Sequence, residues 1–256
     1  MKKPLIVANW KRYIEERDVA LAAAKAIARG VGKINTTIVI CPPALYIDAI
    51  AKAFSSKGVA VGAQAVSSVA GAMQTGELSA AMLADLGASY VIVGHSERRA
   101  RGEDGEAIRA GVEAVLAEKM SPILCIGETA RDASGEHYDV LTSQLREALP
   151  KLSPADAKRL VIAYEPVWAI GKSAAEAMDA RALEETVIYI RKVLAERIGR
   201  TAALAVPILY GGSVEPDNAA QLIGAGVSGF LVGHASVEPK SLLAIAKASN
   251  GASKHH

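Results

Sequence analysis

Three side chains suited to moving protons stand at or just after the ends of short apolar runs in this sequence. They are Lys11, His95 and Glu165, the last placed directly before a proline. A carboxylate can take a proton from one carbon and return it to the next, while an imidazole and an ammonium can stabilise negative charge that develops on oxygen. These residue types predict an acid–base site that acts on a small anion.

Each of the three also has a more ordinary explanation. A glutamate usually pairs with a nearby Lys or Arg, and a single histidine at a strand end is more often a satisfied structural residue. A lysine after a tryptophan is more often simply exposed. The shared position favours the chemical interpretation, because parallel strands of one barrel bring their carboxyl ends to a common rim.

The elements that must position these residues are short β-branched apolar runs bounded by turn signals. Their continuous apolarity is typical of parallel strands that are covered on both faces. We expect eight strands, within 4–10, 36–43, 59–64, 90–95, 121–128, 159–166, 205–212 and 229–234.

Alanine-rich amphipathic stretches alternate with these runs and are predicted as helices. They are 15–29, 44–56, 79–87, 104–119, 138–149, 179–198, 216–225 and 239–248, with a short extra turn at 153–156. Eightfold alternation predicts α/β architecture as a single (β/α)8 barrel, with a long doubly wound sheet as the alternative. Because no linker interrupts the pattern, we expect one domain over 1–250 and a tail, resembling a tag remnant, at 251–256.

Two glycine turns follow the seventh and eighth predicted strands, Gly211-Gly212-Ser213 and Gly233-His234. Barrels often bind phosphate at this place through backbone amides, and glycine lets the main chain approach the anion closely. A single Gly-Gly is merely a turn, but two on consecutive strand ends favour a phosphate site.

The composition argues against several classes of protein. Hydrophobic residues make up 51% and aromatic residues only 4%, which suits helices packed on an aliphatic sheet. The net charge is +2 and no basic stretch is interleaved with aromatic residues, so we expect no nucleic-acid partner. No apolar segment approaches the ~20 residues of a membrane span. Cys41 and Cys125 lie in apolar runs, so a reduced, cytoplasmic protein is expected.

Four segments resemble the signature segments of the triosephosphate isomerase family, in the same order and at comparable spacing. They are ANWK (8–11), GHSERR (94–99), AYEPVWAIG (163–171) and YGGS (210–213), and the similarity spans 4 to about 248. The resemblance implies a TIM barrel that interconverts dihydroxyacetone phosphate and glyceraldehyde 3-phosphate through an enediolate, in glycolysis and gluconeogenesis. It implies neither a metal nor an organic cofactor.

The resemblance also implies roles for individual residues. Glu165 would be the base, His95 the neutral electrophile and Lys11 the cation facing the substrate, with Asn9 and Glu97 as further catalytic residues. The residues implied to bind substrate are Asn9, Lys11, Gly171, Gly212, Ser213, Gly233 and His234. Residues 166–173 would form a lid that excludes water from the intermediate.

The sequence departs from the family pattern at several of these places. The lid lacks the usual Thr-Gly after Gly171, so Tyr210 and Ser213, which clasp lid amides in the family, need different partners. His234 stands where the family has a second glycine, and its amide remains available only if its φ stays negative. Arg12-Tyr13 replaces the usual Met-Asn, near the subunit contact of the family.

The long segment 65–78 has little periodicity, which in a compact domain indicates a functional or a mobile loop. The resemblance, through Thr75-Gly76-Glu77, implies that it inserts into a partner subunit, so we expect a homodimer; a mobile surface loop is the alternative. Met73 at its tip favours burial.

Other functions remain open from the sequence. A related four-carbon sugar phosphate fits an isomerase with an altered lid. A phosphate-binding barrel lyase with a Schiff-base lysine is disfavoured, because no predicted strand interior carries a lysine. A scaffold protein without activity has no use for Lys11, His95 and Glu165 together.

Overall fold

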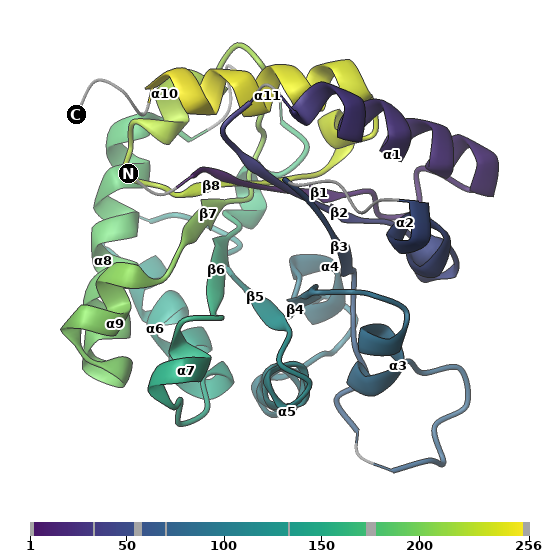
Figure 1. The fold of residues 1–256 in the computed structure, drawn as a ribbon. Helices are drawn as coiled ribbons and strands as arrows, with labels where there is room; N and C mark the ends of the chain where they lie inside the picture. Colours follow the sequence, from purple (N-terminus) through teal and green to yellow (C-terminus); the bar gives the residue numbers. More distant parts are fainter. Residues whose placement is uncertain are drawn as a thin grey trace.

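A computed structural model describes residues 3–32, 34–53, 58–69, 71–132, 134–172 and 178–252 of the chain. It shows a closed barrel in which each strand pairs in parallel with the next and β8 pairs with β1 (Figure 1). The predicted (β/α)8 barrel is therefore confirmed over the doubly wound sheet. The strands are β1 (Leu5–Asn9), β2 (Thr37–Cys41), β3 (Val59–Ala63), β4 (Tyr90–Val93), β5 (Ser121–Ile126), β6 (Val161–Tyr164), β7 (Ile208–Tyr210) and β8 (Gly229–Val232).

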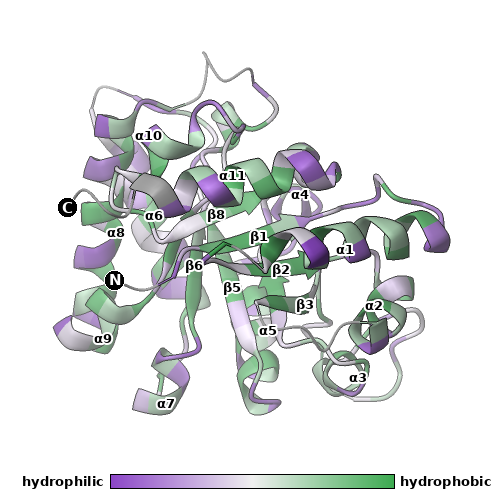
Figure 2. Cartoon of the chain, turned by 45° about the horizontal axis from the view of Figure 1, so that its top comes forward, coloured by the Kyte–Doolittle hydropathy of each residue, from purple (hydrophilic) through white to green (hydrophobic). Residues whose placement is uncertain are grey.

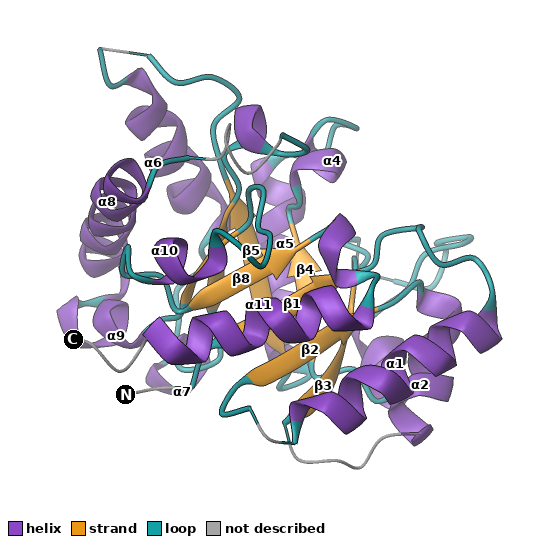
Figure 3. Cartoon of the chain, turned by 90° about the horizontal axis from the view of Figure 1, so that it is seen from above, coloured by secondary structure: helices purple, strands orange, loops and turns teal. Residues whose placement is uncertain are grey.

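Helices surround the barrel on its outer side, as the view from above shows (Figure 3). The α-helices are α1 (Arg17–Val31), α2 (Ile47–Ala53), α3 (Ala80–Asp85), α4 (Ser96–Arg99), α5 (Gly105–Ala117), α6 (Glu136–Ala148), α7 (Pro154–Ala157), α8 (Ala180–Ile198), α9 (Arg200–Ala205), α10 (Ala219–Ile223) and α11 (Pro239–Ala252). Three 3-10 turns accompany them in the described chain: η1 (Ala44–Tyr46), η2 (Val167–Ala169) and η4 (His234–Ser236).

The strands are almost entirely apolar because both of their faces are buried, and polar residues such as Asn9, Thr37 and Ser121 stand only at strand ends. In β1, Leu5 and Val7 point into the barrel interior, where they pack with residues such as Leu231. Ile6 and Ala8 alternate with them and pack outward against the helices. Figure 2 shows the result, with apolar strands at the centre and polar residues on the outer sides of the helices. The packed interior supports a rigid rim at the carboxyl ends of the strands.

The predicted elements near the seventh strand differ most from the observed ones. Residues 205–207 were included in a predicted strand, but helix α9 ends at Ala205 and the strand begins only at Ile208. Arg191 of α8 accounts for this, since its Nη1 donates to the carbonyls of Ala203 (3.0 Å) and Val206 (3.2 Å).

The predicted helix 216–225 is reduced to Ala219–Ile223. Its start signal, Asn218, is used inside the preceding loop instead: the side chain accepts the Glu215 N–H (2.9 Å) and donates to Ser213 O (3.1 Å). The side chain of Asn218 therefore makes no capping hydrogen bond to the helix.

Within the described chain, no helix is long and apolar enough to cross a membrane. Cys41 and Cys125 are buried and unpaired, as the apolar runs around them predict. The predicted tail 251–256 lies partly in α11, which ends at Ala252, and residues 253–256 are outside the described chain.

Candidate active site

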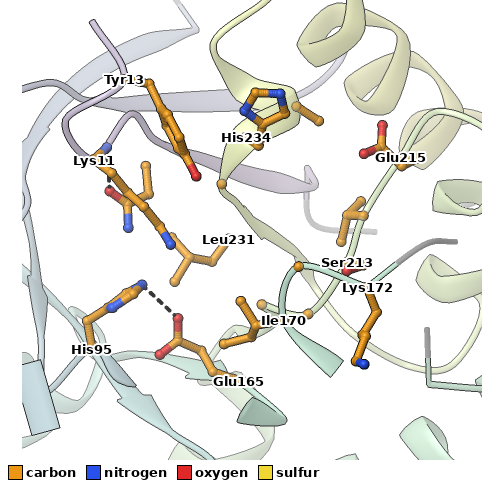
Figure 4. Close-up of a pocket in the computed structure, with 17 residues that line it drawn as sticks. Lys11, Tyr13, His95, Glu165, Ile170, Lys172, Ser213, Glu215, Leu231 and His234 are labelled. Carbon is orange, nitrogen blue, oxygen red and sulfur yellow. Dashed lines mark hydrogen bonds and ion pairs between the residues drawn. The ribbon is translucent and has the colours of Figure 1, made fainter. Parts of the chain in front are cut away.

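A cavity of about 420 Å³ opens at the carboxyl ends of the strands (Figure 4). Its lining comes from segments that follow β1, β4, β6, β7 and β8. The lining residues are Asn9, Lys11, Tyr13, His95, Glu165, Ile170, Gly171, Lys172, Gly211, Gly212, Ser213, Val214, Glu215, Leu231, Gly233, His234 and Ala235. Every residue predicted to be catalytic or to bind substrate lies here except Glu97, which reaches the site through Lys11.

Glu165 and His95 are buried, and their side chains contact each other directly. His95 Nε2 lies 3.1 Å from Glu165 Oε1, and the second carboxylate oxygen accepts the backbone N–H of Ser96 at 3.1 Å. The side chain of His95 is only 8% exposed and that of Glu165 only 3%. The carboxylate of Glu165 is thus held at the cavity wall with both oxygens occupied.

The tautomer of His95 follows from its neighbours. Helix α4 begins directly after His95, and the Glu97 N–H donates to His95 Nδ1 at 3.2 Å. An Nδ1 that accepts a hydrogen bond carries no proton, so the proton of the neutral ring lies on Nε2 and points toward Glu165. The ring therefore presents an N–H donor to the cavity, which is what an electrophile for a developing oxyanion requires.

Lys11 occupies a backbone conformation that side-chain-bearing residues rarely adopt, with φ of 44°. Two side chains hold it there: Asn9 Oδ1 accepts the Lys11 N–H at 3.1 Å, and Gln64 Nε2 donates to the Lys11 carbonyl at 2.7 Å. Gln64 also donates to Cys41 O at 3.0 Å, which ties the turn to β2. This conformation directs the lysine over the mouth of the barrel.

The ammonium of Lys11 lies 2.6 Å from Glu97 Oε1. Burial alone raises the pKa of Glu97, but the hydrogen bond and charge of Lys11, together with His95 and Arg101, outweigh it, so the pKa of Glu97 is below its ordinary value. Glu97 is therefore ionised at neutral pH and positions the lysine. The lysine side chain is 21% exposed, so a ligand in the cavity can reach it.

The opposite end of the cavity is built from backbone. Gly171, Gly212, Ser213, Gly233 and His234 all line it, as predicted for a phosphate site. Gly212 has a packing reason to be glycine, because a Cβ there would lie 2.3 Å from the Tyr210 hydroxyl oxygen. Among the described non-glycine residues only Lys11 and Lys119 have a positive φ, so the φ of His234 is not positive. The backbone N–H of His234 therefore stays available to a phosphate.

The N-terminal part of the lid segment is anchored to the barrel. Ser213 Oγ donates to Ala169 O (3.0 Å), and Trp168 Nε1 donates to the buried Glu128 Oε1 (2.8 Å). Burial raises the pKa of Tyr210 to about 12, so its hydroxyl stays protonated at neutral pH. Ser213 thus hydrogen-bonds to a carbonyl of the lid, whereas the family resemblance implies a lid amide as its partner. Residues 173–177, where the lid departs from the family pattern, lie outside the described chain.

Some residues of this site received no role from the sequence. Tyr13 was connected with a subunit contact, yet it lines the cavity. Glu128 and Gln64 also lie outside the predicted site; their position at the ends of the predicted strands 121–128 and 59–64 is the signal that could have found them. The contact of the Ser96 backbone N–H with Glu165 could not be found from the sequence, because every residue type except proline has this group.

The fold and the cavity define a class: a (β/α)8-barrel enzyme with acid–base groups at the carboxyl mouth. The family model described as "Triosephosphate isomerase" matches residues 4–249. The chain belongs to the triosephosphate isomerase family.

Individual relatives agree over the full length. Proteins named triosephosphate isomerase are 42% identical in Symbiobacterium thermophilum, with 97% of this chain and 98% of the relative covered, and 43% identical in a Bradyrhizobium species, with 96% and 97% covered. A crystal structure of triosephosphate isomerase from Bartonella henselae superposes with a TM-score of 0.84 at 33% identity, covering 96% of this chain and 98% of that one.

Proposed function

We propose that this chain interconverts dihydroxyacetone phosphate and glyceraldehyde 3-phosphate through an enediolate, as a step of glycolysis and gluconeogenesis. The observation that carries the proposal is convergence: Lys11, His95 and Glu165 come from three different strand ends and line one cavity. Membership of the triosephosphate isomerase family supports it independently.

In this proposal Glu165 is the base. Its carboxylate accepts a proton from the carbon beside the substrate carbonyl and returns it to the adjacent carbon. To do so it must give up its contact with His95 Nε2, and a substrate placed between them takes that donor for its own oxygen. When the substrate oxygen replaces Glu165 as the partner of His95 Nε2–H, the base is freed and the carbonyl is polarised at the same time.

Stabilisation of the enediolate is assigned to His95 and Lys11. The Nε2–H of His95 faces the cavity as a neutral donor, and Lys11 supplies positive charge kept in place by Glu97 and Asn9. Both groups are preorganised by hydrogen bonds before substrate binds, so little reorganisation is needed as charge develops.

The phosphate is assigned to the backbone of Gly171, Gly212, Ser213, Gly233 and His234, at the end of the cavity away from His95. Segment 166–172 is proposed as the described part of the lid. Ile170 and Gly171 both line the cavity, so closure of this segment covers the intermediate and excludes water.

The direct test is a coupled assay that compares kcat/KM for dihydroxyacetone phosphate with kcat/KM for four-carbon ketose phosphates. We expect the three-carbon substrate to be preferred by orders of magnitude. A preference for a four-carbon ketose phosphate would contradict the substrate assignment but leave the residue roles intact. No isomerisation of any of them would overturn the function.

We further propose a cytoplasmic homodimer. The segment between β3 and α3, of which residues 64–69 and 71–79 are described, projects away from the barrel (Figure 1). Met73 is 99% exposed, and Val69 of the same loop is also largely exposed. Such apolar exposure on a projecting loop favours insertion into a second copy. The two unpaired, buried cysteines agree with a reducing compartment.

A further inference from the structure

Two of the departures from the family pattern meet in space. Tyr13 follows β1 and His234 follows β8, and these strands are hydrogen-bonded neighbours where the barrel closes. The two rings are in edge-to-face contact, with centroids 5.2 Å apart and planes at 72°. Both residues line the cavity that holds Lys11, His95 and Glu165.

The polar atoms of this pair have unused hydrogen-bonding capacity. Within the described chain, neither the Tyr13 hydroxyl nor the His234 imidazole forms a hydrogen bond or an ion pair. Figure 4 shows the Tyr13 hydroxyl directed toward the interior of the ring of lining residues, with the His234 ring beside it. Tyr13 is 52% exposed, so a ligand can reach it.

The surroundings make an anion the natural ligand. The pair stands at the end of the cavity assigned to phosphate, because His234 follows Gly233 directly in the lining. The Tyr13 hydroxyl points into the same interior as the Lys11 side chain (Figure 4). A phenol and an imidazole N–H are both donors, and phosphate oxygens are strong acceptors. The edge-to-face contact also restricts the Tyr13 ring, so its hydroxyl is partly preorganised.

We propose that Tyr13 and His234 form a side-chain clamp on the phosphate group of the substrate. The clamp adds a phenol and an imidazole donor to the backbone amides of Gly212, Ser213 and Gly233. This inference rests on the proposed function for the identity of the substrate. The binding of a phosphate anion by the pair can nevertheless be tested without turnover.

The test uses inorganic phosphate as the probe and isothermal calorimetry as the readout. Y13F removes the hydroxyl and keeps the ring, while H234G removes the imidazole and restores the simplest residue. We expect each change to raise the Kd for phosphate about 3- to 10-fold, the effect of losing one hydrogen bond. H234Q retains an N–H donor and should recover part of the loss.

Because the two rings support each other, the Y13F/H234G double variant should lose less than the product of the single effects. In the coupled assay, KM for dihydroxyacetone phosphate should rise by a similar factor with kcat within about twofold. Y138F is the matched control. Tyr138 also contacts a histidine ring, His137, at 4.1 Å between centroids, but it does not line the cavity.

Unchanged phosphate affinity in both single variants would overturn the clamp. Tighter binding in H234G would also overturn it, because it would mean that the imidazole obstructs the anion. Failure of the proposed function looks different: the unmodified protein would not isomerise dihydroxyacetone phosphate, whatever its affinity for phosphate.

Discussion

Glu165 is positioned through its backbone as well as through its carboxylate. Its N–H donates to Ile126 O at 2.7 Å, which extends the pairing of β5 and β6 by one residue. On the β5 side the chain continues as Gly127, where a Cβ would lie 1.7 Å from the Glu165 carbonyl oxygen. Only glycine therefore fits at position 127, directly beside the backbone of the proposed base.

We expect Glu165→Asp to lower kcat by roughly 100-fold, because the shorter side chain withdraws the carboxylate by one methylene. The affinity for inorganic phosphate should stay within about twofold, since the phosphate end of the cavity is untouched. Steady-state kinetics and calorimetry on the same preparation check both parts. Unchanged turnover would remove Glu165 from its role as base.

Gly127→Ala should destabilise the fold by about 1–3 kcal/mol or more, because the new methyl group overlaps a backbone carbonyl that cannot move aside freely. Gly32→Ala is the control: nothing lies within 4 Å of its Cβ position, and its φ of −57° suits alanine. Urea unfolding monitored by circular dichroism should separate the two variants. Equal stability of both would contradict this account of Gly127.

At this scale the sequence identified Lys11, His95 and Glu165 because charged or titratable residues stand out at the ends of apolar runs. It did not identify the tautomer of His95 or the amide of Ser96, which depend on backbone geometry. That Tyr13 lines the cavity was not predictable, since which way a residue after a strand points depends on the turn that follows.

Among the elements, the lid and β6 both hydrogen-bond to the buried carboxylate of Glu128. Glu128 Oε1 accepts both the Trp168 Nε1–H and the Tyr164 hydroxyl at 2.8 Å, and Glu128 is only 1% exposed. Burial and the charge of Glu128 together raise the pKa of Tyr164 well above its usual value, so its hydroxyl stays a donor. The two donors link the lid to the barrel wall.

Trp168→Phe should reduce stability by about 1–3 kcal/mol, because it takes one of two donors from a buried carboxylate. Tyr164→Phe should cost a similar amount, and the double variant more than the sum, since Glu128 then loses both donors. Urea denaturation of the four proteins measures this cycle. Strict additivity would show that Glu128 does not couple the lid to β6.

The start of α6 carries a pH-sensitive contact. The hydroxyl of Ser134 and the N–H groups of Glu136 and His137 donate to Asp132, and they hold the pKa of Asp132 well below its usual value. A lowered folded pKa stabilises the fold above the unfolded value, about 3.9, and this contribution is lost as pH falls through the folded pKa.

Asp132→Asn should therefore lower Tm at pH 7, and the difference from the unmodified protein should shrink as the pH falls below about 3.9. Thermal unfolding at several pH values tests this. Asp85→Asn serves as the control, because Asp85 is the last residue of α3 and the N-cap of that helix is Ser79. A difference that stays constant down to the acid limit would contradict the role of the charge.

Element positions were predictable where burial decides them. All eight strands lie within their predicted runs because both faces are apolar. The helix ends near β7 depend instead on individual hydrogen bonds of Arg191 and Asn218. The Arg191 contact is not visible from local sequence, so α9 was missed; Asn218 is of a helix-start type but serves its own loop, so α10 was overextended.

For the whole molecule, closure of the barrel brings the first and last strands together. The pairing of β1 with β8 places Lys11 and Tyr13 beside Gly233 and His234, more than 200 residues away in the chain. Eightfold alternation predicts closure but leaves a long doubly wound sheet as the alternative, which the pairing of β1 with β8 excludes. The contact between the Tyr13 and His234 rings was not predictable, because it requires both closure and particular side-chain rotamers.

Met73→Glu should weaken the proposed dimer roughly 100-fold, because it buries an unpaired charge at the tip of the inserted loop. Sedimentation velocity over a dilution series checks this. Leu204→Glu, a similar change at an exposed leucine of α9, should leave the oligomeric state unchanged. A monomeric unmodified protein, or a dimer indifferent to Met73→Glu, would contradict insertion of the loop.

The engagement of both Glu165 oxygens has a consequence for selectivity against simple ketones and aldehydes. A carbonyl compound without an anionic group gains nothing from the glycine turns, yet it must still separate the carboxylate from the imidazole before any proton can move. Metabolites that merely share a carbonyl are thus rejected by the geometry of the base itself, before their fit in the rest of the cavity matters.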